Sequence, residues 1–159
     1  EELGIPWDTQ DYQVLPDWKP GPSYKRQPPH DLIVINTKVP NHALSHTHRN
    51  PLLQSLSARH NDLRTVWINT RTAAERGIAD GDWFVIETFE GRQQRAIANV
   101  TELVHPEVLA TQGCGGGWMD PATNQEVNFN ALLAIDEDHI DFVTGALDSA
   151  VPARAFKAE

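Results

Sequence analysis

From residue 32 onward, the chain alternates between short apolar stretches and turn residues, and this alternation limits the folds that it can adopt. The apolar stretches are residues 32–35, 65–69, 83–89, 92–101, 108–110 and 151–156. Turn residues separate them, as in Asp80-Gly81-Asp82 and Glu90-Gly91. The pattern predicts a mainly β fold, a compact β-barrel of six or so strands with short helical insertions.

Short helices are expected between the strands. Asn50 followed by Pro51 is typical of an N-cap and a first helical residue, and predicts a helix over residues 51–58. Asn69 or Thr70 is expected to cap a second helix, which ends at Gly77. Residues 129–134 are expected to begin a short helix or a strand.

Residues 1–30 differ in composition from the rest, which predicts an extended arm followed by a barrel domain over residues 31–159. The arm holds six prolines, and proline is disfavoured in helix interiors and central strands. Its two Trp and two Tyr residues indicate that it packs against another surface, and a disordered linker is the alternative. The chain begins at Glu1 without a Met, so it is expected to be either processed or cut from a longer protein.

Charge and composition exclude several classes of function. The net charge is -9 and the pI is near 5.1, which disfavours nucleic-acid binding because phosphate contacts need clustered Lys and Arg. No apolar run approaches the roughly 20 residues that span a bilayer, so direct membrane insertion is not expected. The single cysteine, Cys114, excludes an intrachain disulfide and a zinc site with several cysteines.

The stretch from Thr37 to Leu53, directly after the first predicted strand, is rich in polar and charged side chains. Within thirteen positions it contains Lys38, His42, Ser45, His46, Thr47, His48, Arg49 and Asn50. A polar loop at the end of a buried strand is where a rigid scaffold often places binding groups. The loop could hold a metal through its three histidines, or it could bind an anionic organic ligand.

A series of sequence elements after the loop matches a known family in order and spacing: Val66-Trp67-Ile68-Asn69, Ala73-Ala74, Gly77-Ile78-Ala79-Asp80-Gly81-Asp82, Val85-Ile86-Glu87-Thr88, Gly91, and residues 100–108, 128–132 and 141–145. Together they resemble the C-terminal molybdopterin-dinucleotide-binding domain of the dimethyl sulfoxide reductase superfamily. The resemblance covers residues 31–156 and implies a six-stranded double-psi β-barrel. Lys38-Val39-Pro40 with His42, Thr47 and residues 50–53 is most similar to the polysulfide, thiosulfate and arsenate reductase branch.

The resemblance implies a bis(molybdopterin guanine dinucleotide) cofactor that carries molybdenum or tungsten. The residues expected to bind it are Thr37, Lys38, His42, Ser45, His46, Thr47 and Asn130. Lys38 would lie near phosphate, and hydroxyl or amide side chains would hydrogen-bond to pterin edges. His42 matches the loop histidine of the family, whereas Leu44 stands where many members have a polar residue.

The resemblance also implies that the chain is the cofactor-capping domain of a larger oxidoreductase. The cofactor would carry the reaction, and this chain would supply no catalytic acid, base or nucleophile, so the isolated domain is expected to be inactive. Expected partners are the remaining domains of the parent subunit and an iron–sulfur electron-transfer subunit, with an iron–sulfur cluster elsewhere in the enzyme. The periplasmic and cytoplasmic sides of a bacterial membrane complex are both compatible with this branch.

Two other classes of function stay open at this point. In the first, His42, His46 and His48 form a cupin-like metal site, with His46 and His48 on the same side of a strand. In the second, the barrel is an adaptor module. The glycines around Cys114 could form an anion-binding nest or a surface loop, and Cys114 itself is expected to have no catalytic role.

Overall fold

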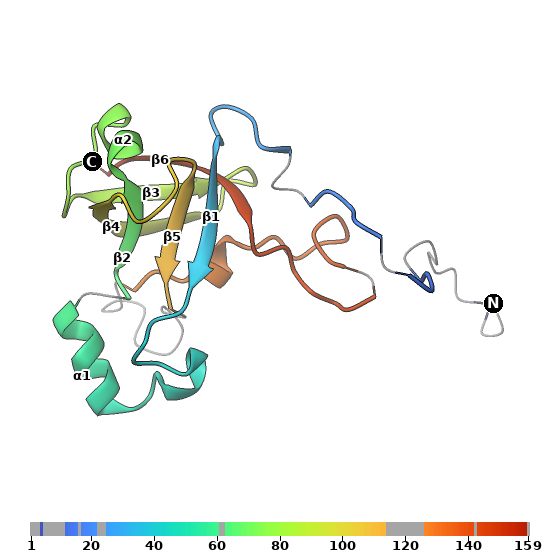
Figure 1. Cartoon of the computed structure of the whole chain (residues 1–159), viewed down its shortest axis with the longest axis horizontal. Helices are drawn as coiled ribbons and strands as arrows, with labels where there is room; N and C mark the ends of the chain where they lie inside the picture. Colours follow the sequence, from blue (N-terminus) through green and yellow to red (C-terminus); the bar gives the residue numbers. More distant parts are fainter. Residues whose placement is uncertain are drawn as a thin grey trace.

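The computed structural model describes residues 4, 12–15, 17–21, 25–60, 63–113, 126–141 and 143–158, without the side chain of Ser45. In these residues, six strands close into a barrel in the order β1-β5-β2-β4-β3-β6 (Figure 1). The strands are β1 (Leu32–Thr37), β2 (Thr65–Asn69), β3 (Trp83–Thr88), β4 (Gln93–Thr101), β5 (Val108–Gln112) and β6 (Val151–Lys157). The predicted mainly β, six-stranded double-psi barrel with short helical insertions is confirmed.

Two of the six strand pairings are parallel, and they determine where loops emerge. Strand β1 pairs in parallel with β5, and β2 with β4, whereas the other four pairings are antiparallel. The register of the first pair sets Thr37 beside Gln112. Parallel strands have their carboxyl ends at the same edge. Strands β1 and β5 therefore end side by side at Thr37 and Gln112, at the end of the barrel where helix α1 (Pro51–His60) lies (Figure 1).

Alternate side chains of the strands fill the barrel interior. Val34 faces Leu109 across the β1–β5 pair, and Leu109 faces Ile68 across the β5–β2 pair. These three side chains are fully buried, as are Val66, Phe84, Ile86 and Leu132. The alternation follows from the period of two along a strand, which sends successive side chains to opposite faces.

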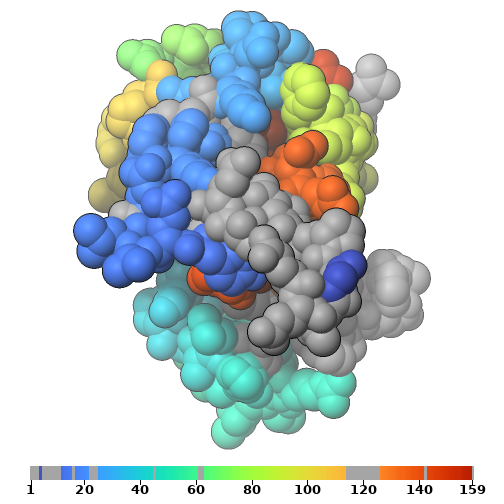
Figure 2. Space-filling view, turned by 90° about the vertical axis from the view of Figure 1, so that its right-hand side faces the viewer, coloured from blue at the N-terminus to red at the C-terminus, as the bar shows by residue number. Residues whose placement is uncertain are grey.

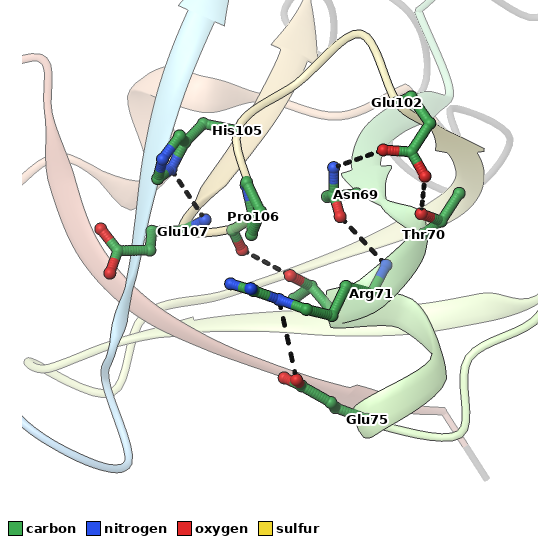
Figure 3. Close-up of polar contacts among 9 residues, drawn as sticks. Asn69, Thr70, Arg71, Glu75, Glu102, His105, Pro106 and Glu107 are labelled. Atoms are coloured by element: carbon green, nitrogen blue, oxygen red, sulfur yellow. Dashed lines mark hydrogen bonds and ion pairs between the residues drawn. The ribbon is translucent and has the colours of Figure 1, made fainter.

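Both predicted helix caps are present. The backbone N–H groups of Leu52 and Leu53 donate to Asn50 Oδ1 at 3.0 and 3.4 Å, at the start of α1. The N–H of Arg71 donates to Asn69 Oδ1 at 3.0 Å, at the start of α2 (Thr70–Glu75) (Figure 3). Each cap satisfies N–H groups that have no partner inside the helix.

The cap of α2 also joins the helix to the β4–β5 turn. Asn69 Nδ2 donates to the carbonyl of Val104 at 2.9 Å. Thr70 Oγ1 donates to the carboxylate of Glu102 (Figure 3). Helix α2 lies at the opposite end of the barrel from α1 (Figure 1). This end is therefore closed by contacts within the chain.

Two 3₁₀ helices complete the described secondary structure. Residues 129–134, expected to start a helix or a strand, contain the 3₁₀ helix η3 (Phe129–Leu132). The other, η2 (Leu44–Thr47), lies in the polar loop and was not predicted. No helix in the described part of the chain is long and apolar enough to cross a membrane.

The described part of the arm leaves the start of β1 and extends away from the barrel (Figure 1), so its blue residues lie in front of the barrel in the view of Figure 2. Arg26 forms an ion pair with Glu107 at 2.6 Å, and the ring of His30 packs edge-on against Phe89. Tyr12 and Trp18 are 53% and 68% exposed. The end of the arm next to the barrel is thus attached to it, while the more distant aromatic rings face outward. The predicted division into arm and barrel domain stays a prediction.

Replacement of Phe84 by Ala tests the core. The ring is fully buried, and its removal should leave a cavity that lowers the free energy of unfolding by about 3–5 kcal/mol. Urea unfolding of the chain, followed by tryptophan fluorescence, measures the loss. Phe89→Ala is the matched control, because Phe89 is 69% exposed and should lose much less. Equal losses for the two variants would contradict the assignment of Phe84 to the core.

Candidate functional site

A small pocket lies where the polar loop leaves the barrel. Its volume is about 90 Å³. The residues that line it are Asn36, Thr37, Lys38, Val39, His42, Leu44 and Gly113. Pockets that enclose an organic ligand usually measure about 300–1,000 Å³. This pocket can therefore receive one polar group of a ligand but cannot enclose a dinucleotide.

The pocket contains three of the residues predicted to bind a cofactor. Thr37 ends β1 and donates its hydroxyl proton to the carbonyl of Thr111 at 2.8 Å, so its oxygen keeps lone pairs for a further contact. Lys38 follows it and is exposed, which leaves its ammonium group accessible from solvent. His42 forms part of the wall and is buried.

Hydrogen bonds inside the loop use both ring nitrogens of His42. Nδ1 lies 3.0 Å from Thr47 Oγ1, and Nε2 lies 2.9 Å from Ser57 Oγ on α1. Asn41 Nδ2 donates to the same Ser57 oxygen at 2.6 Å, and the N–H of Ala43 donates to Thr47 Oγ1 at 3.0 Å. His42 thus connects η2 to α1 and fixes the shape of the pocket wall. The contacts with a cofactor predicted for His42 and Thr47 stay predictions.

The backbone of the loop takes an unusual conformation beside the pocket. Leu44 has a φ of 52°, in the left-handed region that leucine rarely adopts. Its side chain is 49% exposed, although it lines the pocket. Such conformations persist where the surrounding contacts enforce them, and they are concentrated at binding and active sites. The hydrogen bond from the N–H of Ala43 to Thr47 Oγ1, which spans Leu44, supplies that enforcement here.

His48 is buried next to His42. Its ring is 4% exposed, and the two ring centroids are 4.6 Å apart. Burial lowers the pKa of His48, and the neighbouring His42 lowers it further, whereas Glu126 opposes the shift. The ring of His48 is neutral near pH 7 because its pKa is below the ordinary value of 6.5.

The prediction that His46 and His48 lie on the same side of a strand is wrong. Leu44–Thr47 forms the 3₁₀ helix η2, with His46 exposed and His48 buried. The helix forms because the His42–Thr47 contact draws the loop into a tight turn. Among the described residues, no group of three or more His, Cys, Asp or Glu side chains could hold a metal. The geometry therefore disfavours the cupin-like alternative.

Some residues of the predicted site lie outside the pocket or outside the described residues. Asn130 is exposed in η3 and does not line the pocket. The side chain of Ser45 and the segment 114–125, with its glycines and Cys114, are outside the described residues. Their predicted roles stay predictions.

A larger cleft elsewhere on the barrel has a volume of about 420 Å³ but includes none of the predicted site residues. Its lining residues are Pro29, Asp31, Arg76, Arg154, Ala155 and Phe156. Both arginines already form ion pairs, Arg76 with Asp31 and Arg154 with Glu87, each at 2.6 Å. Because neighbouring carboxylates neutralise these two guanidinium groups, the cleft is poorly suited to an anionic ligand.

The predicted binding residues did not include Asn36, Gln112 or Gly113, although Gly113 is one of the glycines around Cys114 that could form an anion-binding nest. Asn36 and Gly113 line the pocket, and Gln112 pairs with Thr37 at its edge. Gln112 and Gly113 lie more than seventy positions from Thr37 in the sequence, and only the β1–β5 register brings them there. The glycine-rich stretch that begins at Gly113 was the one available signal.

The lowered pKa of His48 predicts a pH-dependent stability. The unfolded chain holds a proton on His48 at pH values where the folded chain does not, so protonation favours unfolding. The free energy of unfolding should fall as pH drops below the unfolded pKa near 6.5, and this contribution should level off below the folded pKa. The free energy of unfolding can be measured by urea unfolding at pH values from roughly 7.5 to about 5. Its change with pH should be smaller for His48→Asn than for the wild type.

Asp82→Asn is the control for this measurement. A hydrogen bond from Lys157 is the main cause of the lowered pKa of Asp82, so this carboxylate stabilises the fold at neutral pH and loses that effect only under acid conditions. The variant should keep the wild-type slope near neutral pH and differ in acid. An unchanged slope in His48→Asn would contradict the assignment to His48.

Comparisons with known proteins identify the family. Residues 32–144 match the model of the molydopterin dinucleotide binding domain. No curated protein gives a significant match. Acetylene hydratase from Pelobacter acetylenicus has a similar structure, with a TM-score of 0.69 and 16% identity over 91% of this chain and 21% of that one. At this identity the likeness shows the fold, and this chain spans about a fifth of that protein's length. Since the family match covers most of the chain, this protein belongs to the molydopterin dinucleotide binding domain family.

Proposed function

We propose that this chain caps a bis(molybdopterin guanine dinucleotide) cofactor in a larger molybdenum or tungsten oxidoreductase. The observation that carries the proposal is the pocket at the ends of β1 and β5, inside the segment that matches the family. Thr37 and Lys38, predicted from the sequence to bind cofactor, lie together in its wall.

The chemistry of the pocket fits part of such a ligand. Lys38 offers a positive charge for phosphate, and Thr37 and Asn36 offer oxygen and amide groups for pterin or guanine edges. The whole chain has a net charge of -9, so an anionic ligand must be bound by local groups such as these. When bound, the cofactor would supply two-electron chemistry at its metal. The side chains of this domain would bind and orient it.

The other domains of the parent subunit are the partners in this proposal. The small pocket leaves most of a dinucleotide uncovered, so a second surface must enclose the rest. The chain spans about a fifth of acetylene hydratase, which has room for such a surface. Leu52 on α1 is 80% exposed and Trp18 on the arm is 68% exposed, as suits faces that other domains cover. An iron–sulfur cluster and an electron-transfer subunit belong to the same proposal.

The cofactor content of the full-length parent tests the proposal. The purified protein should contain molybdenum or tungsten, and acid treatment should release a guanine nucleotide in proportion to it. The isolated 159-residue chain should show no reductase turnover, because the metal would be held mainly by other domains. Absence of both metal and nucleotide from the parent, or turnover by the isolated chain, would refute the proposal.

Lys38→Ala should weaken cofactor retention in the parent enzyme. Hydrogen bonds to charged groups contribute about 1.5–3 kcal/mol, which corresponds to roughly ten- to a hundredfold in affinity. The guanine nucleotide that stays bound during gel filtration in rising urea measures the effect. Lys38→Arg should retain most of the cofactor because it preserves the charge.

Lys157→Ala is the matched control for loss of one lysine. Lys157 lies on β6 and forms an ion pair with Asp82 at 2.7 Å, away from the residues that line the pocket. It should retain cofactor as the wild type does. If Lys38→Ala and Lys157→Ala behave alike, Lys38 does not contact the cofactor.

A further inference from the structure

Gln112, the last residue of β5, carries a buried amide nitrogen. The residue is 8% exposed, and its Nε2 has no hydrogen-bond partner among the described residues. A buried amide without an acceptor has given up its hydrogen bonds to water without replacement, which destabilises the folded chain. Such a group in a native protein calls for an acceptor that the folded chain alone does not supply.

The position of Gln112 is fixed beside the candidate pocket. It pairs with Thr37 in the β1–β5 register, and the next residue, Gly113, lines the pocket together with Thr37. The N–H of Gly113 donates to the carbonyl of Thr37 at 2.7 Å, which continues the ladder to the pocket edge.

Gly113 lets the backbone pass close to neighbouring side chains directly after Gln112. Its φ is +67°, and a Cβ there would lie 2.9 Å from Leu63 Cδ2 and 3.2 Å from Val39 Cγ2. The turn after β5 is therefore packed tightly against the neighbouring side chains and needs glycine. Gln112 is held at the edge of the pocket by paired and packed backbone on both sides.

The buried Nε2 of His30 also has no hydrogen bond, but a carboxylate of the chain lies near it. His30 Nε2 lies 3.9 Å from Glu87 Oε1, so a carboxylate of the chain faces it. No ion pair is available to the neutral amide of Gln112, which can be satisfied only by a hydrogen-bond acceptor. The pocket beside it is where an acceptor from a ligand would enter.

We infer that the side-chain amide of Gln112 donates a hydrogen bond to a carbonyl or phosphoryl oxygen of the bound dinucleotide. This inference rests on the proposed function. It adds a binding residue from β5 to those on β1 and the polar loop, so that the ligand is held from two adjacent strands. Gln112 would be a binding residue with no part in the chemical step.

The test compares two variants of the full-length parent, prepared with cofactor and also from a host strain that lacks molybdopterin synthesis. Gln112→Leu removes the amide at similar size, and Gln112→Glu keeps the shape but removes the donor. Without cofactor, Gln112→Leu should unfold at the wild-type temperature or above, because the unsatisfied donor is gone. With cofactor, both variants should release guanine nucleotide about tenfold faster than wild type, the effect expected for one hydrogen bond.

Gln112→Glu also reports on the acceptor. A carboxylate facing a phosphoryl oxygen should speed release beyond the rate of Gln112→Leu, whereas a carbonyl acceptor should give similar rates for the two variants. Gln93→Leu is the matched control. Gln93 is exposed on β4 and donates to Glu87 outside the pocket, so this variant should release nucleotide at the wild-type rate.

Wild-type release rates in both Gln112 variants would overturn the inference while leaving the proposed function intact. A lower unfolding temperature of cofactor-free Gln112→Leu, with unchanged release, would show that the amide has a partner within the protein, which also overturns it. A wild-type parent without metal and guanine nucleotide would refute the proposed function and this inference together.

Discussion

The parallel pairing of β1 with β5 determines the rest of the candidate site. Two parallel strands that pair must be joined by a long crossover connection. Here the sequence between Thr37, the end of β1, and Val108, the start of β5, forms that connection. The crossover contains the polar loop, α1 and three further strands, and the barrel closes around it. Because both strands end at the same edge, a pocket wall can be built from the end of one and the turn after the other. An antiparallel pairing would have sent these two segments to opposite ends of the barrel.

The polar loop is held in shape by contacts within the chain, which leaves its remaining groups for a ligand. His42 spans from η2 to α1 through Thr47 and Ser57, and the cap at Asn50 fixes where α1 begins. A loop with its conformation already fixed loses less entropy when it binds. In this arrangement the histidine with both nitrogens engaged orients the loop, and the exposed Lys38 is the side chain with freedom to reach a ligand.

The sequence predicted the parts of the fold that depend on local chemistry. Residues 65–69 form β2 as expected, and Asn50 and Asn69 cap their helices, because hydrophobic alternation and capping act over a few residues. The 3₁₀ helix at Leu44–Thr47 was missed because the His42–Thr47 contact that shapes it requires a ring orientation that Ser57, 15 positions from His42 on α1, also holds. Gln112 was missed for the same physical reason, since its place beside Thr37 comes from strand register.

The size of the pocket bears on how such a domain can act. A volume of about 90 Å³ suits a phosphate or one edge of a ring system, and a dinucleotide extends well beyond it. Binding energy from this domain alone would come from a few polar contacts, while most of the ligand surface stayed in water. Tight binding requires burial of most of a ligand's surface. In the proposed parent enzyme, a domain with this pocket would close over a ligand already held from the other side, and its exposed Leu52 on α1 and Trp18 on the arm would face the other domains.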